Sequence, residues 1–203
     1  DALAGSLQAG RDQLARLVSR DVAQLDVAAV RESAIESLAE NFNDSVVAPV
    51  FWFVLFGLPG AALYRFANTA DAMWGYRGPR NGRDWTWAGK VAARADDLLS
   101  WLPARIAAVL LALAGRGFPW RRLRAEARRT VSPNSGWPMA AMALALGVRL
   151  RKPGVYALNV DAPSPGVDDA RRARRLAGRA TAMLLVLAIA AVLAHGVLRE
   201  VRA

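Results

Sequence analysis

The sequence lacks several features on which many enzymes depend. It contains no cysteine, which excludes disulfide bonds and thiolate metal sites. Its one histidine, His195, lies in an apolar run, where we expect a packed or interfacial imidazole rather than a ligand. The motifs GxxxxGK(S/T), GxGxxG and GxSxG are also absent, so any use of ATP would require an unusual site. Chemistry must therefore come from carboxylates, amides and arginines.

Charge is missing from long stretches of the chain. No charged side chain occurs from Val46 to Tyr64, and a helix of these residues would extend about 28 Å, close to the hydrocarbon thickness of a membrane. A second run, residues 180–198, is rich in Leu, Val, Ile and Ala. We predict that both runs cross a membrane as helices. Two weaker runs, 98–114 and 137–148, are interpreted as membrane-spanning, re-entrant or buried segments.

These runs predict an all-α fold: a polytopic integral membrane protein with kinked or broken helices and polar loops. Kinks or a break are expected within the first run, at Pro49, Gly57, Pro59 and Gly60. Broken helices at membrane depth usually line a cavity in the protein. We treat residues 1–203 as a single domain. Because the chain does not begin with Met, we expect the whole protein to have a further upstream segment.

The net charge of +10 is distributed unevenly. Residues 1–45 carry a net charge of −4, whereas residues 65–179 carry +13. Basic residues beside apolar runs are typical of cytoplasmic flanks of membrane helices that contact anionic lipid. We therefore predict a multi-pass protein of the bacterial inner membrane. The arginine-rich stretch 121–129 is interpreted as a membrane flank, and no nucleic-acid partner is expected.

Periodicity and turn residues predict the other elements. Leucine and valine recur at helical spacing in residues 3–25, which indicates an amphipathic helix. A second helix should begin with Asp26 as its N-cap. A third should occupy residues 85–102 and end near Pro103. Proline and glycine in residues 151–166 predict a loop.

Acids and amides gather immediately before the first apolar run, at Glu36, Glu40, Asn41, Asn43 and Asp44. Carboxylates there could hold Mg²⁺ or orient an amine. Asp44 is the strongest candidate because it adjoins nonpolar residues, where an ionisable group is costly. A solvated helix face with a cap explains the group equally well.

Two further groups have spacings that suit ligand binding. Asn68 and Asp71 lie one helical turn apart, so their oxygens could share an ion or phosphate, although an ordinary N-cap pair is the alternative. Ser132 and Asn134 precede a predicted helix, where backbone amides can bind an anion, although a simple loop and cap explains them equally well.

Arg94, Asp96, Asp97 and Arg105 form a mixed group that enters an apolar segment. An arginine at membrane depth needs a carboxylate, a phosphate or water as a partner, unless its side chain extends to the membrane interface. We therefore predict that Arg105 faces a polar ligand or cavity.

Four blocks carry a family resemblance: IESLAENFNDSVVAPVFW, NTADAMWGY, AARADDLLSWLPARI and SPNSGWPMAAMALALGV. In this order, across roughly residues 10–160, they resemble the successive motifs of the CobD/CbiB family. The resemblance implies an adenosylcobinamide-phosphate synthase, a membrane enzyme of cobalamin biosynthesis. Such an enzyme joins (R)-1-aminopropan-2-ol, usually as its phosphate, to a propionate of the corrinoid adenosylcobyric acid. It also implies amide formation by a ligase, with ATP and Mg²⁺ as candidate cofactors, neither firmly implied.

On this resemblance we assign roles as hypotheses. The catalytic candidates are Glu36, Glu40, Asp44 and Asp97. The substrate-binding candidates are Asn41, Asn68, Arg94, Arg105, Ser132 and Asn134. The metal candidates are Asp44, Asp71 and Asp96. The oligomeric state is left open.

The sequence also departs from the family pattern, and other functions stay open. Met139 stands where Glu is common, Ser45 where Gly is common, and Arg151 and Lys152 where a Gly pair is usual. The loss of a carboxylate at Met139 weakens any mechanism that assigns it a proton. The alternatives are a Mg²⁺-dependent membrane phospho- or prenyltransferase that uses the same acids, and a non-catalytic membrane sensor that retains the fold.

Overall fold

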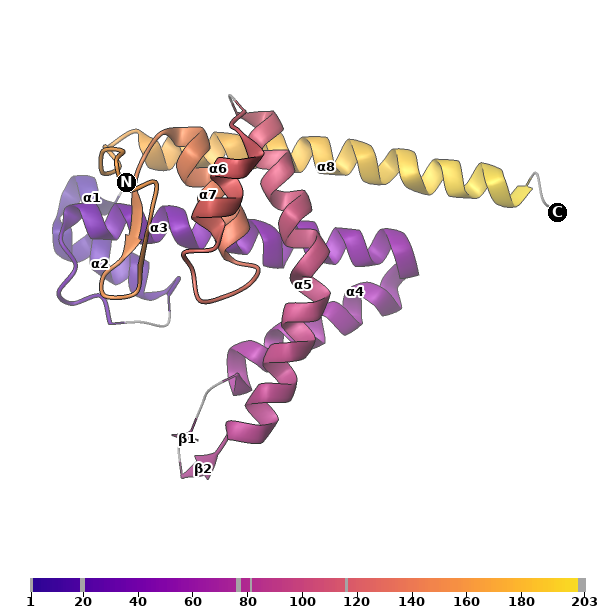
Figure 1. Cartoon of the computed structure of the whole chain (residues 1–203), viewed down its shortest axis with the longest axis horizontal. Helices are drawn as coiled ribbons and strands as arrows, with labels where there is room; N and C mark the ends of the chain where they lie inside the picture. The colour runs from indigo at the N-terminus through magenta and orange to yellow at the C-terminus, as the bar shows by residue number, and fades with distance from the viewer. Residues whose placement is uncertain (1, 19–20, 76–77, 81, 116, 201–203) are drawn as a thin grey trace.

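The computed structural model describes residues 2–18, 21–75, 78–80, 82–115 and 117–200, and this part of the chain is mostly helical (Figure 1). In chain order the elements are α1 (Ala2–Gly5), α2 (Leu7–Ala15), α3 (Val27–Phe42), η1 (Asn43–Val47), α4 (Ala48–Trp74), β1 (Pro79–Arg80), β2 (Arg83–Asp84), α5 (Thr86–Ala114), α6 (Trp120–Ala127), α7 (Gly136–Leu146), β3 (Leu150–Lys152), β4 (Tyr156–Leu158) and α8 (Asp169–Glu200). The strands form two antiparallel hairpins, β1–β2 and β3–β4. The predicted all-α class with broken helices is confirmed.

The first apolar run forms a bent hairpin rather than one straight helix. α3 begins after Asp26, whose carboxylate accepts a hydrogen bond from the Ala29 amide at 2.7 Å, as predicted for an N-cap. α3 continues through η1 into α4 (Figure 1). At Gly57 the φ and ψ angles are 64° and −155°, a conformation that glycine adopts without a Cβ clash. The helix then turns back and packs along α5 (Figure 1).

The prediction that a helix ends near Pro103 is wrong, because α5 continues to Ala114. Proline has no amide hydrogen, so the carbonyl four residues earlier, at Leu99, loses its helical donor. The indole N–H of Trp52 in α4 donates to that carbonyl at 3.0 Å. A residue of another helix thus supplies the missing hydrogen bond, which no local pattern could reveal.

Two other predicted elements differ from the structure. The amphipathic helix expected over residues 3–25 is shorter and divided, because Ser6 has an extended backbone and its hydroxyl caps α2 by accepting from the Ala9 amide at 3.0 Å. α2 then ends at Ala15. The loop predicted at residues 151–166 contains part of the β3–β4 hairpin.

The core lies where α5 and α7 pack together, with α3 and the first half of α8 against them. Ala173, Ala180 and Leu184 of α8 are buried, whereas its second half exposes large apolar side chains such as Ile189 and Leu193. In Figure 1 this second half extends beyond the rest of the chain. Among the described residues, three helical segments are long and apolar enough to cross a membrane: Val27–Trp74, Thr86–Ala114 and Asp169–His195.

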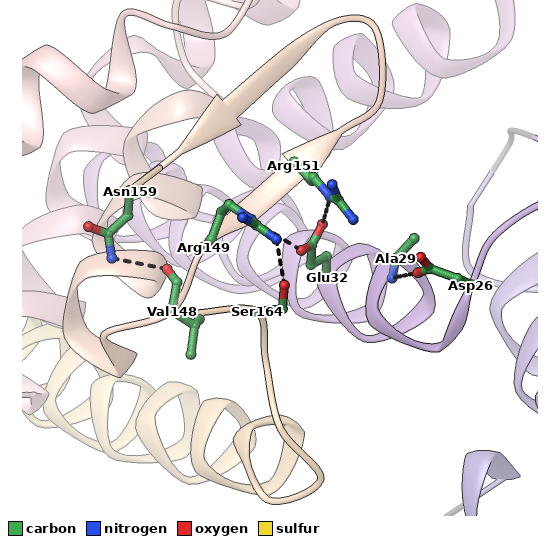
Figure 2. A network of polar contacts seen from close by, with 8 residues as sticks. All are labelled: Asp26, Ala29, Glu32, Val148, Arg149, Arg151, Asn159 and Ser164. Carbon is green, nitrogen blue, oxygen red and sulfur yellow. Dashed lines mark hydrogen bonds and ion pairs between the residues drawn. The ribbon is translucent and has the colours of Figure 1, made fainter. Parts of the chain in front are cut away.

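A buried ion-pair network attaches the β3–β4 hairpin to α3 (Figure 2). Glu32 is fully buried, and its Oε2 lies 3.0 Å from the Nε of Arg151. Its Oε1 lies 3.7 Å from the Nε of Arg149, whose Nη2 donates to the Ser164 hydroxyl at 2.6 Å. The acidic side of α3 is therefore not a solvated face, because two arginines compensate its first glutamate.

Candidate functional site

The site begins at η1, a π-helical turn in which the Ala48 amide donates to the Asn43 carbonyl. Such turns are frequent at functional sites. The buried Asn43 donates from its Nδ2 to the Oδ1 of Asp44 at 2.7 Å. The Oδ1 of Asn43 is also buried, and it accepts no hydrogen bond from the described residues. Arg65 of α4 holds the turn, because its Nη1 donates to the Asp44 carbonyl at 3.1 Å.

Carboxylates from α4 and α5 meet next to this turn. Asn68 donates from its Nδ2 to the Oδ1 of Asp96 at 3.1 Å, and its own Oδ1 accepts from Arg65 at 3.1 Å. The carboxylates of Asp44, Asp71 and Asp97 repel that of Asp96 electrostatically. We call these four aspartates the acid cluster. Four carboxylates contributed by η1, α4 and α5 favour a bound cation or ammonium group between them.

Asn134 connects the acid cluster to a basic region. Its Nδ2 donates to the Asp97 carbonyl at 2.7 Å and approaches the Asp97 Oδ1 at 3.4 Å. Its Oδ1 accepts from the Nη1 of Arg105 at 2.6 Å. Arg105 also donates to the Trp101 carbonyl at 2.7 Å and the Pro133 carbonyl at 3.1 Å. A single buried amide therefore separates a carboxylate from a guanidinium.

Arg105 faces a pocket of about 600 Å³, which we call the tryptophan–arginine pocket. It is lined by residues of α5, α6, the segment between α6 and α7, and the first turn of α7: Trp101, Arg105, Trp120, Arg124, Ala127, Arg128, Thr130, Val131, Ser132, Pro133 and Trp137. The Arg105 guanidinium lies 4.6 Å from the ring centre of Trp101 and 4.7 Å from that of Trp137. These rings fix the plane of the guanidinium without neutralising its charge.

The segment before α7 shapes this pocket. The Ser132 hydroxyl accepts from the amides of Asn134 and Ser135, each at 3.2 Å, which forms a tight turn. Gly136 follows the turn, and a Cβ there would lie 2.2 Å from the Ala127 carbonyl oxygen. Only glycine allows this close approach between α6 and α7. Ser132 was predicted to bind substrate. It lines the pocket, and its hydroxyl is engaged by the two backbone amides of this turn.

Glu36, Glu40 and Asn41 line a second cavity, of about 180 Å³, between α3 and the β3–β4 hairpin. Lys152 and Met139 also line it, and the Tyr156 hydroxyl donates to the Met139 sulfur at 3.6 Å. Two of the residues that depart from the family pattern, Met139 and Lys152, therefore line this cavity. Glu40 also acts electrostatically on Asp44, so the cavity adjoins the acid cluster.

A magnesium site is not preformed. Among the residues that the structure describes, no group of three or more His, Asp or Glu side chains is placed to hold a metal ion. The acid cluster is thus too spread to serve as a metal cage made by the protein alone. The metal roles of Asp44, Asp71 and Asp96 stay predictions, and we derive no chemical step through a metal.

Comparison with known proteins identifies the family. The profile of the CobD/Cbib protein family matches residues 1–183. The chain belongs to the CobD/CbiB family. The resemblance predicted from four sequence blocks is thereby confirmed. All four blocks contribute to the acid cluster, to its link with Arg105 or to the tryptophan–arginine pocket.

Curated members of the CobD/CbiB family match most of the chain. The probable cobalamin biosynthesis protein CobD of Methanothermobacter thermautotrophicus is 48% identical over 83% of this chain and 57% of its own length. The cobalamin biosynthesis protein CobD of Rhodobacter capsulatus is 44% identical over 94% of this chain and 63% of its own length. That of Chromobacterium violaceum is 42% identical over 95% and 63%, respectively.

The chain thus spans less than two thirds of the length of these CobD relatives. No solved structure matches it.

The structure brings most of the predicted site residues into one region. Those in the acid cluster or its link are Asp44, Asn68, Asp71, Asp96, Asp97, Arg105 and Asn134. Arg94 is exposed on α5 and lines neither cavity. Nothing in the sequence indicated that Arg65, Arg124 and Arg128 belong to the site, and Asn43 was placed in the acidic group without a role. Arg124 and Arg128 were interpreted as membrane flanks, although their spacing of four places them on one helix face.

Proposed function

We propose that the chain is the larger part of a membrane enzyme of cobalamin biosynthesis. The proposed reaction joins aminopropanol, or its phosphate, to a propionate of adenosylcobyric acid and yields adenosylcobinamide or its phosphate. The family membership, the names of the CobD relatives and the apolar helices support this proposal. We propose in addition that the protein is located in the bacterial inner membrane.

The observation that carries the proposal is the contact chain from Asp97 through Asn134 to Arg105. Amide formation needs a place for an ammonium group and an adjacent place for a carboxylate. The acid cluster provides the first, and the unpartnered Oδ1 of Asn43 offers a further acceptor for an N–H group. Arg105 provides the second, because a guanidinium binds a carboxylate with two parallel hydrogen bonds.

The residues can also perform the proton transfers. An ammonium nitrogen has no lone pair, so a carboxylate must first accept one of its protons. Asp44 and Asp97 each act electrostatically on Asp96, and we propose that one of them is this base. Arg105 then offsets the negative charge that develops on the propionate oxygen as nitrogen attacks. ATP, where bound, would convert the propionate oxygen into a leaving group.

The test uses the full-length protein in detergent with cobyric acid, aminopropanol phosphate and ATP, with corrinoid products separated by chromatography. Asp97→Asn and Arg105→Gln should each lower the rate at least about 100-fold if they act in proton transfer and charge stabilisation. Asp168→Asn is the matched control, because the Asp168 carboxylate forms an exposed ion pair with Arg171 and lines neither cavity. Wild-type rates in both site variants would refute the assigned roles.

Binding separates this function from its alternatives. A synthase should copurify with a corrinoid that is visible in its absorption spectrum, whereas a phospho- or prenyltransferase should not. A sensor would bind the corrinoid and form no amide product. Product formation by the wild-type protein decides between these outcomes.

A further inference from the structure

We propose that a groove beside α8 binds the phosphate of an anionic phospholipid. The groove has a volume of about 280 Å³. Its basic residues are Arg172, Arg175 and Arg179 of α8, and the C-terminal ends of α5 and α7, at Ala114 and Leu146, also line it. We call it the arginine groove.

Two of the three arginines are free to bind an anion. The Arg172 guanidinium is engaged, because it donates to the Asp169 carboxylate at 2.5 Å and to the Leu146 carbonyl at 3.1 Å. Arg175 and Arg179 form no ion pair or hydrogen bond with the residues that the structure describes, and both are exposed. They lie four positions apart, on one face of α8. Two neighbouring guanidinium groups without a partner favour a phosphate, whose oxygens match their donors.

The surroundings of the groove favour a lipid over a soluble phosphate. Arg179 is the last charged residue before the uncharged run of α8, which begins at Ala180. Val186, two helical turns further along the same face, is exposed, and so is Leu113 at the end of the apolar run of α5. A ligand in the groove therefore meets positive charge at one end and bare apolar surface at the other. A phospholipid matches both ends, whereas a soluble phosphate matches only the first.

The first experiment counts lipid molecules bound to the full-length protein in non-ionic detergent by native mass spectrometry. The probes are dioleoylphosphatidylglycerol and dioleoylphosphatidylcholine, which have the same acyl chains. The wild-type protein should bind the first about tenfold more tightly, because the choline group of the second compensates the charge of its phosphate. Equal affinity for the two lipids would overturn the proposal.

Variants then locate the binding site on α8. Arg175→Gln combined with Arg179→Gln should weaken phosphatidylglycerol about 20-fold and leave phosphatidylcholine nearly unchanged. Lysine at both positions should retain most of the affinity, because the charge is kept. Arg171→Gln combined with Arg174→Gln is the matched control: it removes the same charge from exposed positions of α8 that do not line the groove. An equal loss in this control would show a general charge effect and refute the site.

A competition experiment distinguishes a lipid from a soluble phosphate. Glycerophosphoglycerol has the same headgroup without acyl chains, so at equal concentration it should not displace bound phosphatidylglycerol. Displacement would assign the groove to a soluble phosphate ester and overturn the proposal. The inference goes beyond the proposed function and does not depend on it, because Ala114 at the groove lies about 25 Å along α5 from Asp97.

Discussion

The hydrogen bond from Trp52 to the Leu99 carbonyl predicts a specific rescue. Trp52→Phe removes the indole N–H and leaves that carbonyl without a donor, because Pro103 cannot supply one. A half-buried carbonyl that loses its partner costs about 1–2 kcal/mol of unfolding free energy. The additional substitution Pro103→Ala restores the amide hydrogen four residues after Leu99. It should therefore remove most of the penalty of Trp52→Phe.

A double-mutant cycle isolates this effect. Trp52 also contacts Phe51 and Phe56, but the loss of those ring contacts is the same with or without Pro103 and cancels in the cycle. We expect a coupling energy of about 1 kcal/mol. The measurement is unfolding of the full-length protein in mixed detergent micelles, followed by far-UV circular dichroism. A coupling energy indistinguishable from zero would refute the compensation between the two helices.

Three further predictions follow from contacts outside the proposed reaction. Arg151→Ala should destabilise the protein by about 2–4 kcal/mol in the same unfolding assay, because Glu32 would keep a buried charge with only a weaker partner. Gly136→Ala should cost more than about 2 kcal/mol and widen the tryptophan–arginine pocket, since a methyl group would collide with backbone. Single cysteines at Ala23 and Arg83 should react with an impermeant maleimide from the same side of the membrane, because α4 bends back between them.

Matched controls decide these three cases. Arg171→Ala breaks an exposed ion pair and should change stability by less than about 1 kcal/mol. Gly178→Ala adds a methyl group where nothing lies within 4 Å, so it should be neutral or slightly stabilising. The absence of cysteine from the sequence makes the labelling experiment free of background. Labelling from opposite faces would show that the segment crosses once, as the apolar run alone predicts.

Sequence patterns correctly predicted the caps and turns that depend on contacts between residues close together in the chain. The Asp26 cap and the turn before α7 depend on side chains within a few residues, so both were predictable. The break at Gly57 was expected from the cluster of glycine and proline, although its fold-back was not. The continuation of α5 through Pro103 depends on a residue about fifty positions earlier. No local signal contains that contact.

The sequence predicted the acidic residues of the site better than its arginines. Asp44 was identified because a carboxylate beside nonpolar residues is costly, and Asp96 because it lies with Asp97 where an apolar segment begins. Arg124 and Arg128 occur in a run of arginines in which every member has the same apparent role. Only the packing of α6 against the start of α7 at Gly136 distinguishes the two that line the pocket. Arg94 is the opposite case. It lies in a block that resembles a family motif, but its side chain is exposed and lines neither cavity.

The bend at Gly57 has a consequence for biogenesis. From Val46 to the bend, the uncharged chain can reach only about half the width of the lipid interior, and from the bend to Tyr64 even less. Each arm alone is therefore too short to cross the lipid interior. We expect the two arms to insert as one unit, with Gly57 at the greatest depth.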